Sequence, residues 1–453
     1  MSGETPVLLV VCGRSCGSID WVLPVLHVLH RSGECQVKVF FKCETICQRM
    51  QQDYQDLASI LAASRVEIIT KSSLLSQLGF RDKLGILLQN AIEQVSGRRP
   101  LKAIEKIVQF VEQVAKLPFS KSVVRANKLA DTLAARLLTQ RLANRRVEYV
   151  LHDFPADVPV FSAEFAGADI VYFPHGTLSF ERLHNNSTRI QHMVEAEPLG
   201  AIPEDATWLV GNPGEEPYYR RTGLRSKVVA CGHPKFDRWW AGVLNRYASD
   251  LPEQQTAQSE GPRILFLSVP ARKFSDASHR KKLLADMFEV AAEQHWDLRV
   301  KLHPHEDHQE FQAIAAAAKF ADFQWCHSSV SGAATQVDFV VCFPTSAAMD
   351  AIAAGAPVIE FFDFSMQKHT SFLGEGGNKT SIYRAEGLVE PANNAAELAE
   401  LTRQITQDAD RRQKLLSAQE TKLAALAVHH GNATEQVLAV LQGPIPHQER
   451  IAA

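Results

Sequence analysis

The segment DFVVCFPTSAAMDAIAAGAPVIEF, residues 338–361, contains a strand, a helix and a second strand in succession. Its opening apolar run predicts a buried strand, Thr345 and Ser346 are expected to begin a helix that continues through the small residues after them, and PVIEF predicts the next strand. Strands that alternate with helices form mainly parallel sheets covered on both faces. This stretch therefore predicts a doubly wound α/β domain.

The same alternation extends to both sides of this segment. Strands RILFLSV (263–269) and DLRVKLHP (297–304) precede it, each followed by a helical pattern. An earlier α/β series begins with PVLLVVCG (6–13), and the polar stretch 248–262 separates the two series. We therefore expect two doubly wound Rossmann-like domains facing a central cleft, the GT-B architecture. The expected boundaries are 1–247 for the first domain, 248–262 for a linker, 263–395 for the second domain, and 396–453 for C-terminal helices.

The first domain carries a helical insertion, expected at about residues 73–146. Residues 98–146 contain twelve Lys or Arg residues against three acidic ones. Amphipathic basic helices of this kind suit an anionic membrane surface or an anionic acceptor. The alternative is a solvated face that packs on its own domain.

Composition excludes several classes of protein. A net charge of −3 over 453 residues gives no global reason to expect nucleic-acid binding. No apolar run reaches the ~18 residues that cross a bilayer, and the N-terminus reads as a strand rather than a signal peptide. Eight scattered cysteines lack the spacing of a zinc site, so no metal site is predicted. We expect a cytoplasmic protein, with peripheral contact to the inner face of the cytoplasmic membrane as the alternative role of the basic helices.

Polar side chains follow the predicted strands of the second domain. Lys301 and His303 end one strand, and Thr345 and Ser346 follow another, where hydroxyls and helix-start N–H groups can bind an anion. Asp350 lies one helical turn further on, within reach of a ribose. Arg272, after strand 263–269, would complete a phosphate clamp. No GxGxxG or P-loop sequence occurs, which disfavours an ordinary NAD domain or ATPase.

Two residues of the first domain are candidates for a general base. DIVYF (169–173) runs directly into His175 and Gly176, and a histidine with a pKa near neutrality suits this role. Asp153, at the end of strand VEYVLHD, is the second candidate. A single histidine or aspartate in such a turn can instead be purely structural.

Five motifs, in chain order, resemble those of the CDP-glycerol glycerophosphotransferase family, the teichoic acid polymerases and related capsule enzymes, whose fold is GT-B. They are HGTL (175–178), GHPKFD (232–237), ILFLSVPAR (264–272), KLHP (301–304) and TSAAMD (345–350). The resemblance implies that His175 acts as the base or orients the acceptor. It also implies that His303, Thr345 and Ser346 hold the donor's phosphates and that Asp350 binds its ribose. The chain departs from the family pattern at Leu178, at Lys235 and at Cys342 to Pro344.

These features predict a transferase of bacterial surface polysaccharide synthesis, for capsule, lipopolysaccharide or teichoic-acid-like polymers. Its donor would be a CMP- or CDP-linked glycosyl or glycerophosphate group, and its acceptor a carbohydrate or a lipid-linked molecule. No cofactor is expected, and no Asp-x-Asp pair stands where a metal-dependent transferase would need one. One alternative is an isomerase like UDP-N-acetylglucosamine 2-epimerase, and another is a non-catalytic scaffold that docks on membranes. The helices after residue 395, expected to be two, either return to the first domain or serve a partner.

Overall fold

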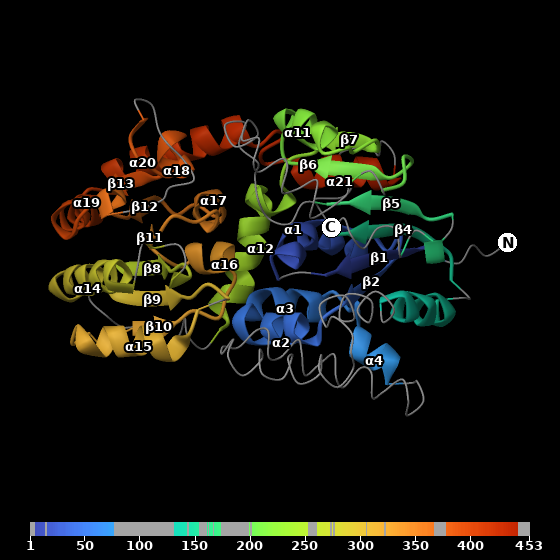
Figure 1. Ribbon diagram of the computed structural model, residues 1–453, viewed down its shortest axis with the longest axis horizontal. Coiled ribbons are helices and arrows are strands. Elements are labelled where there is room, and N and C mark those ends of the chain that lie inside the picture. Colours follow the sequence, from blue (N-terminus) through green and yellow to red (C-terminus); the bar gives the residue numbers. More distant parts are fainter. Residues whose placement is uncertain are drawn as a thin grey trace, which may run out of the picture.

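Two parallel sheets, each with its own helices, make up the protein (Figure 1). The computed structural model describes residues 5–13, 16–76, 131–142, 145–153, 161, 163–165, 167–173, 199, 202–251, 261–271, 274, 277–304, 306–320, 323–366 and 377–442. Most of the predicted basic insertion lies outside these ranges, as does the HGTL motif. The unit around the first sheet is called the first domain, and the unit around the second sheet the second domain.

The first domain is built on seven parallel strands in the order β3-β2-β1-β4-β5-β6-β7. The strands are β1 (Val7–Cys12), β2 (Gln36–Phe41), β3 (Glu67–Thr70), β4 (Val147–His152), β5 (Asp169–Tyr172), β6 (Thr207–Val210) and β7 (Lys227–Ala230). From β1 the chain builds the sheet first toward β3 and then, from β4, in the other direction. The topological switch point therefore lies between β1 and β4.

Helices cover both faces of this sheet. They are α1 (Cys16–Ser32), α2 (Glu44–Asp53), α3 (Gln55–Ala63), α4 (Lys71–Leu75), η3 (Pro213–Glu215), α11 (Glu216–Arg221), η4 (Pro234–Phe236) and α12 (Arg238–Ser249), with a further helical stretch over residues 131–141. Thr70 begins α4 with a capping box, its side chain accepting from Ser73 N at 3.2 Å.

The second domain has six parallel strands in the order β10-β9-β8-β11-β12-β13. The strands are β8 (Arg263–Leu267), β9 (Asp297–Lys301), β10 (Phe323–Trp325), β11 (Phe339–Cys342), β12 (Val358–Phe361) and β13 (Glu390–Ala392). The helices that follow β8 along the chain are α14 (Ala277–Glu293), α15 (His308–Ala317), α16 (Val330–Ala334), α17 (Ala347–Ala353), η6 (Phe364–Met366), α18 (Ile382–Ala385), α19 (Ala395–Gln407), α20 (Ala409–Leu426) and α21 (Ala433–Gln442), the last of which packs on the first domain. Here the switch point lies between β8 and β11.

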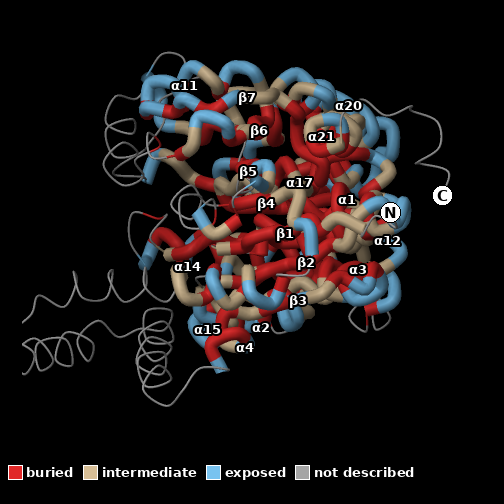
Figure 2. Tube along the Cα trace, turned by 90° about the vertical axis from the view of Figure 1, so that its right-hand side faces the viewer, coloured by how far each residue is buried: buried red, intermediate tan, exposed pale blue. Residues whose placement is uncertain are grey.

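The predicted α/β architecture is confirmed: two doubly wound sheets form from the two sequence series. Successive residues of the central strands enter cores on opposite faces, as Leu8 and Leu9 do in β1 and Ile264 and Leu265 in β8. The central strands are buried along their length (Figure 2). Such double burial explains why these strands read as continuous apolar runs.

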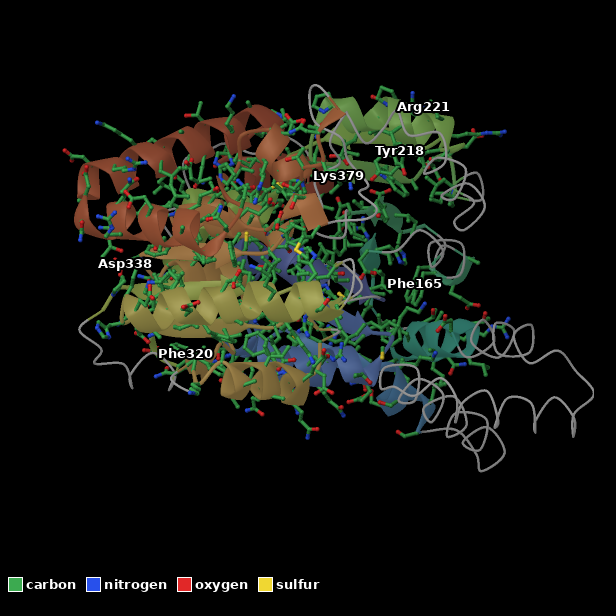
Figure 3. The ribbon with its side chains drawn as sticks, turned by 60° about the vertical axis from the view of Figure 1, so that its left-hand side comes forward. Phe165, Tyr218, Arg221, Phe320, Asp338 and Lys379 are labelled. Atoms are coloured by element: carbon green, nitrogen blue, oxygen red, sulfur yellow. The ribbon has the colours of Figure 1, made fainter. Side chains whose placement is uncertain are left out.

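The sheets are oriented with their carboxyl ends toward each other. Asp338, immediately before β11, lies at the end of the second domain remote from the first, and Phe165, before β5, lies toward the opposite end of the molecule (Figure 3). The carboxyl end of β9 contacts the first domain, since Nζ of its last residue, Lys301, donates to the Asp53 carbonyl at 2.9 Å. Both switch points therefore open toward the junction between the domains.

Between residues 395 and 442, where the structure describes this segment, the chain forms three helices rather than the two expected. Asp408 has an extended backbone conformation and caps α20 by accepting from Arg411 N, which separates α19 from α20. The last helix, α21, packs on the first domain, where Val437, Leu438 and Leu441 join the core that also contains residues of α1. Of the two alternatives left open by the sequence, the return to the first domain is the one observed. None of the described helices is long and apolar enough to span a membrane.

A buried histidine in β4 provides a test of this core. His152 is fully buried beside the Phe161 ring, and neither ring nitrogen has a hydrogen-bond partner in the described part of the chain. Burial, and to a smaller degree Lys42, lowers the pKa of His152 from 6.5 to about 3. Between pH 6.5 and pH 3, His152 is protonated in the unfolded chain but neutral in the folded protein. The free energy of unfolding therefore decreases as the pH falls through this range.

We therefore expect His152→Leu to gain on the wild type as the pH falls. The difference in free energy of unfolding, variant minus wild type, should be about 2 kcal/mol higher at pH 5 than at pH 7.5, since each pKa unit is worth about 1.4 kcal/mol. Urea unfolding of both proteins at the two pH values measures this difference. An equal difference at both values would contradict the assigned environment of His152.

Candidate functional site

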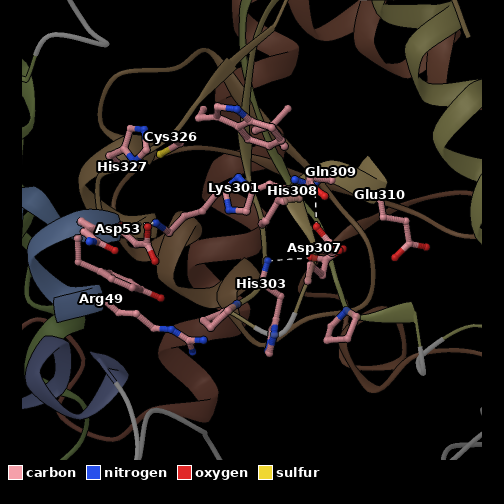
Figure 4. A pocket seen from close by; sticks show the side chains of 18 of the residues that line it. Arg49, Asp53, Lys301, His303, Asp307, His308, Gln309, Glu310, Cys326 and His327 are labelled. Atoms are coloured by element: carbon pink, nitrogen blue, oxygen red, sulfur yellow. Dashed lines mark hydrogen bonds between the residues drawn. The ribbon is translucent and has the colours of Figure 1, made fainter. Parts of the chain in front are cut away.

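A cavity of about 850 Å³ lies between the two domains (Figure 4). The first domain contributes the end of α2 and the residue after it, including Arg49, Asp53 and Tyr54. The second domain contributes the residues at and after the carboxyl ends of β8, β9 and β10, among them Lys301 and His303. Such an edge of parallel strands is the common location of ligand sites in α/β proteins.

Lys301, a predicted phosphate ligand, lies in the wall of this cavity and connects the domains. Its ammonium donates to the carbonyls of Asp53, in the first domain, and Ser328, in the second. The same nitrogen lies 4.3 Å from the centroid of the Tyr54 ring. Lys301 thus adds positive charge to the cavity wall while holding α2 against β9. Its contact with a donor phosphate stays a prediction.

His303 also lines the cavity, as predicted from the KLHP motif. Its backbone N–H donates to Glu306 Oε2 at 2.8 Å, and Glu306 Oε1 accepts from Arg280 Nη2 at 2.8 Å and from Ser268 Oγ at 2.7 Å. The buried Glu306–Arg280 pair therefore holds the loop after β9 against α14. The hydrogen bond to Glu306 fixes the backbone of His303 and so determines where its ring lies in the cavity.

Arg49 is a cavity residue that the sequence reasoning missed. It lies in α2, and its guanidinium points toward His303 across the cavity (Figure 4). Among the described residues no carboxylate forms an ion pair with Arg49. Arg49 and His303 therefore present donor groups from opposite domains to the same space.

The second group of predicted residues follows β11, on the other side of the switch point. Thr345 and Ser346 are half-buried, so the sequence expectation of accessible hydroxyls is compatible with their placement. The helix begins at Ala347, after both hydroxyls, and Ala347 N donates to Thr345 Oγ1 at 3.3 Å. Neither residue lines the Arg49–His303 cavity.

Asp350 of α17 has a partner within the protein. Its Oδ1 lies 2.6 Å from Lys235 Nζ, in the segment that precedes α12. Burial raises the pKa of the Asp350 carboxyl, and Lys235 opposes that rise. The carboxylate is thus engaged at the domain junction, and its predicted contact with a ribose stays a prediction.

Asp153 lies at the switch point of the first sheet. It is 1% exposed, and its two oxygens accept from Gly13 N at 2.8 and 3.0 Å, while Ser18 Oγ donates to Oδ2 at 2.5 Å. These bonds tie the loop after β1 and the first turn of α1 to the end of β4. They favour a positioning role for Asp153, and its role as a base remains untested. His175 and Arg272 lie outside the described residues.

The cavity at the junction has a mixed polar wall, which contains basic side chains as well as the carboxylates of Asp53, Glu306, Asp307 and Glu310. Arg49, Lys301 and His303 provide donors around one cavity. Within the described ranges, no group of three or more His, Cys, Asp or Glu side chains has an arrangement that could hold a metal ion. Burial raises the pKa of the Cys16 thiol to about 12, with Lys301 opposing the rise, so this cysteine stays protonated near neutral pH.

No family model matches the sequence, and no curated protein matches it either. Solved structures do match. A putative UDP-N-acetylglucosamine 2-epimerase from Listeria monocytogenes is 10% identical, with 99% of this chain and 98% of that chain covered at a TM-score of 0.54. The UDP-GlcNAc 2-epimerase from Neisseria meningitidis, bound to UDP-GlcNAc, is 11% identical over 97% of this chain and 100% of that chain, with a TM-score of 0.53.

A glycosyltransferase from Rickettsia africae is 12% identical over 97% of this chain and 98% of that chain, with a TM-score of 0.50. At such identities a structural likeness establishes the fold and leaves the activity open. Together with the two facing parallel sheets and the cavity between them, these likenesses confirm one prediction: the chain has the GT-B fold.

Proposed function

We propose that the protein is a GT-B transferase that uses a nucleotide-activated donor, with a CMP- or CDP-linked glycosyl or glycerophosphate group as the donor class. The pathway proposed is bacterial surface polysaccharide synthesis. The observation that carries the proposal is the cavity between the domains, where Arg49 of the first domain faces His303 of the second beside Lys301. Donor groups that converge from both sides suit a phosphate group held between two domains.

The proposed reaction divides the work between the domains. An acceptor hydroxyl attacks the activated carbon or phosphorus of the donor, its proton passes to His175, and the bond to the nucleotide phosphate breaks. Negative charge develops on the departing nucleotide, where cationic groups and hydroxyls lower the barrier. Arg49, Lys301, His303 and Arg272 would meet this charge together with the hydroxyls of Thr345 and Ser346, and Asp350 would hold the ribose.

Nucleotide binding tests the proposal directly. Thermal unfolding with CMP, CDP, UDP and GDP should show a rise in the midpoint with one of them, because a ligand present at 100 times its Kd stabilises by about 2.7 kcal/mol. We expect Arg49→Met to raise the Kd of that nucleotide by about 10- to 100-fold, since a charge-assisted hydrogen bond contributes about 1.5–3 kcal/mol.

Arg246→Met is the matched control. Arg246 is an exposed arginine of α12 that does not line the Arg49–His303 cavity, so its replacement should leave the Kd unchanged. Absence of binding to all four nucleotides, measured by calorimetry, would contradict the proposal and favour the membrane-docking scaffold. Equal Kd values for Arg49→Met and the wild type would remove this cavity from the donor site.

An epimerase is the second candidate, because solved structures described as UDP-N-acetylglucosamine 2-epimerases share this fold at TM-scores of 0.53 and 0.54. The two activities differ in their need for an acceptor. An epimerase converts UDP-N-acetylglucosamine alone, with inversion at the carbon that bears the N-acetyl group. A transferase requires a second substrate. Proton NMR of the protein incubated with UDP-N-acetylglucosamine alone distinguishes them.

A further inference from the structure

The segment GHPKFD, residues 232–237, meets three parts of the molecule at the domain junction. Its helical turn η4 contacts α1 of the first domain, α17 of the second domain, and the returning helix α21. The proposed reaction assigns no task to this motif. Each of its polar residues nevertheless has a defined partner.

Lys235 forms the central contact. Its ammonium lies 2.6 Å from Asp350 Oδ1 in α17 and 3.7 Å from Asp20 Oδ2 in α1, and its side chain is 3% exposed. One cation thus lies between two carboxylates that belong to different domains. Burial alone would lower the pKa of Lys235, but Asp350 and Asp20 outweigh it and the net direction is upward. Lys235 is therefore charged at neutral pH.

Neighbouring contacts hold the segment itself in place. Trp21 Nε1 donates to His233 Nδ1 at 2.9 Å, which ties the segment to α1. The Asp237 carboxylate accepts from Ala433 N and Thr434 N, both at 2.8 Å, and so caps the start of α21. The contacts of His233 before it and Asp237 after it therefore fix the position of Lys235.

The two carboxylates that Lys235 contacts occupy related positions. Asp20 lies in the first turns of α1, the helix that follows β1, and Asp350 lies in α17, the helix that follows β11. Each helix begins beside the switch point of its own sheet, where α/β proteins bind their ligands. The loop before α17 contains Thr345 and Ser346, and the loop before α1 contains Gly13, which Asp153 holds. Lys235 therefore connects the two helices that begin beside the switch points of the two sheets, although neither helix lines the Arg49–His303 cavity itself.

Net stability does not account for this arrangement well. Desolvation of a buried ion pair offsets most of the attraction between its charges, so such pairs contribute little net stability, whereas their directional contacts can fix one geometry. Burial raises the pKa of Asp20 to about 7, with Lys235 opposing the rise and Asp350 adding to it. A carboxyl so unfavourably placed is more readily explained by a need for geometry than by a gain in stability.

We propose that Lys235 is a positioning residue: by pairing with Asp20 and Asp350 at once, it sets the placement of the two switch-point loops relative to each other and so the geometry of the donor site. The effect on the donor rests on the proposed function. The effect on the domain junction does not.

Amide hydrogen exchange without nucleotide tests the structural half. In Lys235→Met, peptides that cover the first turns of α1 and all of α17 should exchange at least ten times faster, while peptides of β8 and β11 keep the wild-type rate. Lys235→Arg, which retains the charge, should restore most of the protection. Lys227→Met, at an exposed lysine of β7, is the matched control and should change neither helix.

Lys235→Met leaves two buried carboxylates without their cation, and this variant could fail to fold. The double variant Lys235→Met/Asp350→Asn removes one of them and should show the same faster exchange at α1 and α17. Wild-type exchange at both helices in either folded variant would overturn the proposal. Faster exchange spread evenly over both domains would overturn it too, because it would reveal a general loss of stability.

Kinetics with the donor test the functional half. A positioning role predicts that Lys235→Met raises the KM for the donor at least tenfold, with a smaller change in kcat, and that Lys235→Arg recovers much of the loss. A fall in kcat at unchanged KM would overturn this half. If no nucleotide binds, the proposed function fails, and the exchange result still decides whether Lys235 positions the domains.

Discussion

Gly232→Ala is expected to destabilise the protein by about 2–5 kcal/mol, the sum of a left-handed backbone penalty and an overpacked contact. Gly232 has φ +78°, a conformation that residues with a Cβ rarely adopt. A Cβ placed there would lie 2.1 Å from the Val428 carbonyl oxygen, which belongs to the segment returning to the first domain. Because that neighbour is backbone, the returning segment itself would have to move.

Gly242→Ala is the matched control for this variant. Gly242 lies in α12, has no neighbour within 4 Å of an added Cβ, and needs no positive φ. Alanine there should be neutral or stabilising by up to about 1 kcal/mol, because it is the better helix former. Denaturant unfolding of the two variants and the wild type measures both effects. A Gly232→Ala protein as stable as Gly242→Ala would show that the returning segment does not cross at Gly232.

His175→Ala is expected to lower turnover by about 10²- to 10⁴-fold, the usual contribution of a positioned general base, while donor binding survives. His175 is the first candidate for this role because it follows the predicted strand DIVYF, and Asp153 is the second candidate. Asp153 accepts hydrogen bonds from Gly13 N and Ser18 Oγ, and these contacts suit a positioning role for its carboxylate.

Asp153→Ala provides the contrast. It leaves the Gly13 N–H and the Ser18 hydroxyl without their acceptor, so we expect its unfolding midpoint to fall together with its turnover. Single-turnover kinetics and calorimetry with the bound nucleotide separate chemistry from binding for both variants. Normal turnover by His175→Ala would exclude this histidine as the base. An Asp153→Ala protein with an unchanged midpoint and no turnover would instead identify Asp153.

Much of the architecture could be predicted from strand and helix patterns. Strands buried on both faces, such as β1 and β8, are long apolar runs between turn residues, and these runs identify them without any tertiary information. The strands β6, β10 and β13 were not predicted; β10 and β13 have only three residues each, which carry too little periodicity. The start of α17 was placed two residues early, since the hydroxyls at 345 and 346 match a helix cap in sequence.

The candidate site was predictable only in part. Lys301 and His303 follow a strand, and the carboxyl ends of parallel strands are a general location for ligand contacts. Arg49 carries no such signal, because an arginine within a polar helix resembles any solvated residue. Asp350 was expected to face a ligand, and its ion pair with Lys235 could not be foreseen from a separation of more than a hundred residues along the chain.

The sequence by itself determined the two doubly wound sheets, since burial on both faces imposes an apolar pattern that local reading detects. It also determined which loops carry polar groups at the ends of those strands. Only the tertiary structure decided which groups meet across the junction: Arg49 with His303 around one cavity, and Lys235 with Asp20 and Asp350. The physical reason is that contacts between domains depend on how two finished sheets pack together, and no local pattern of residues encodes that packing.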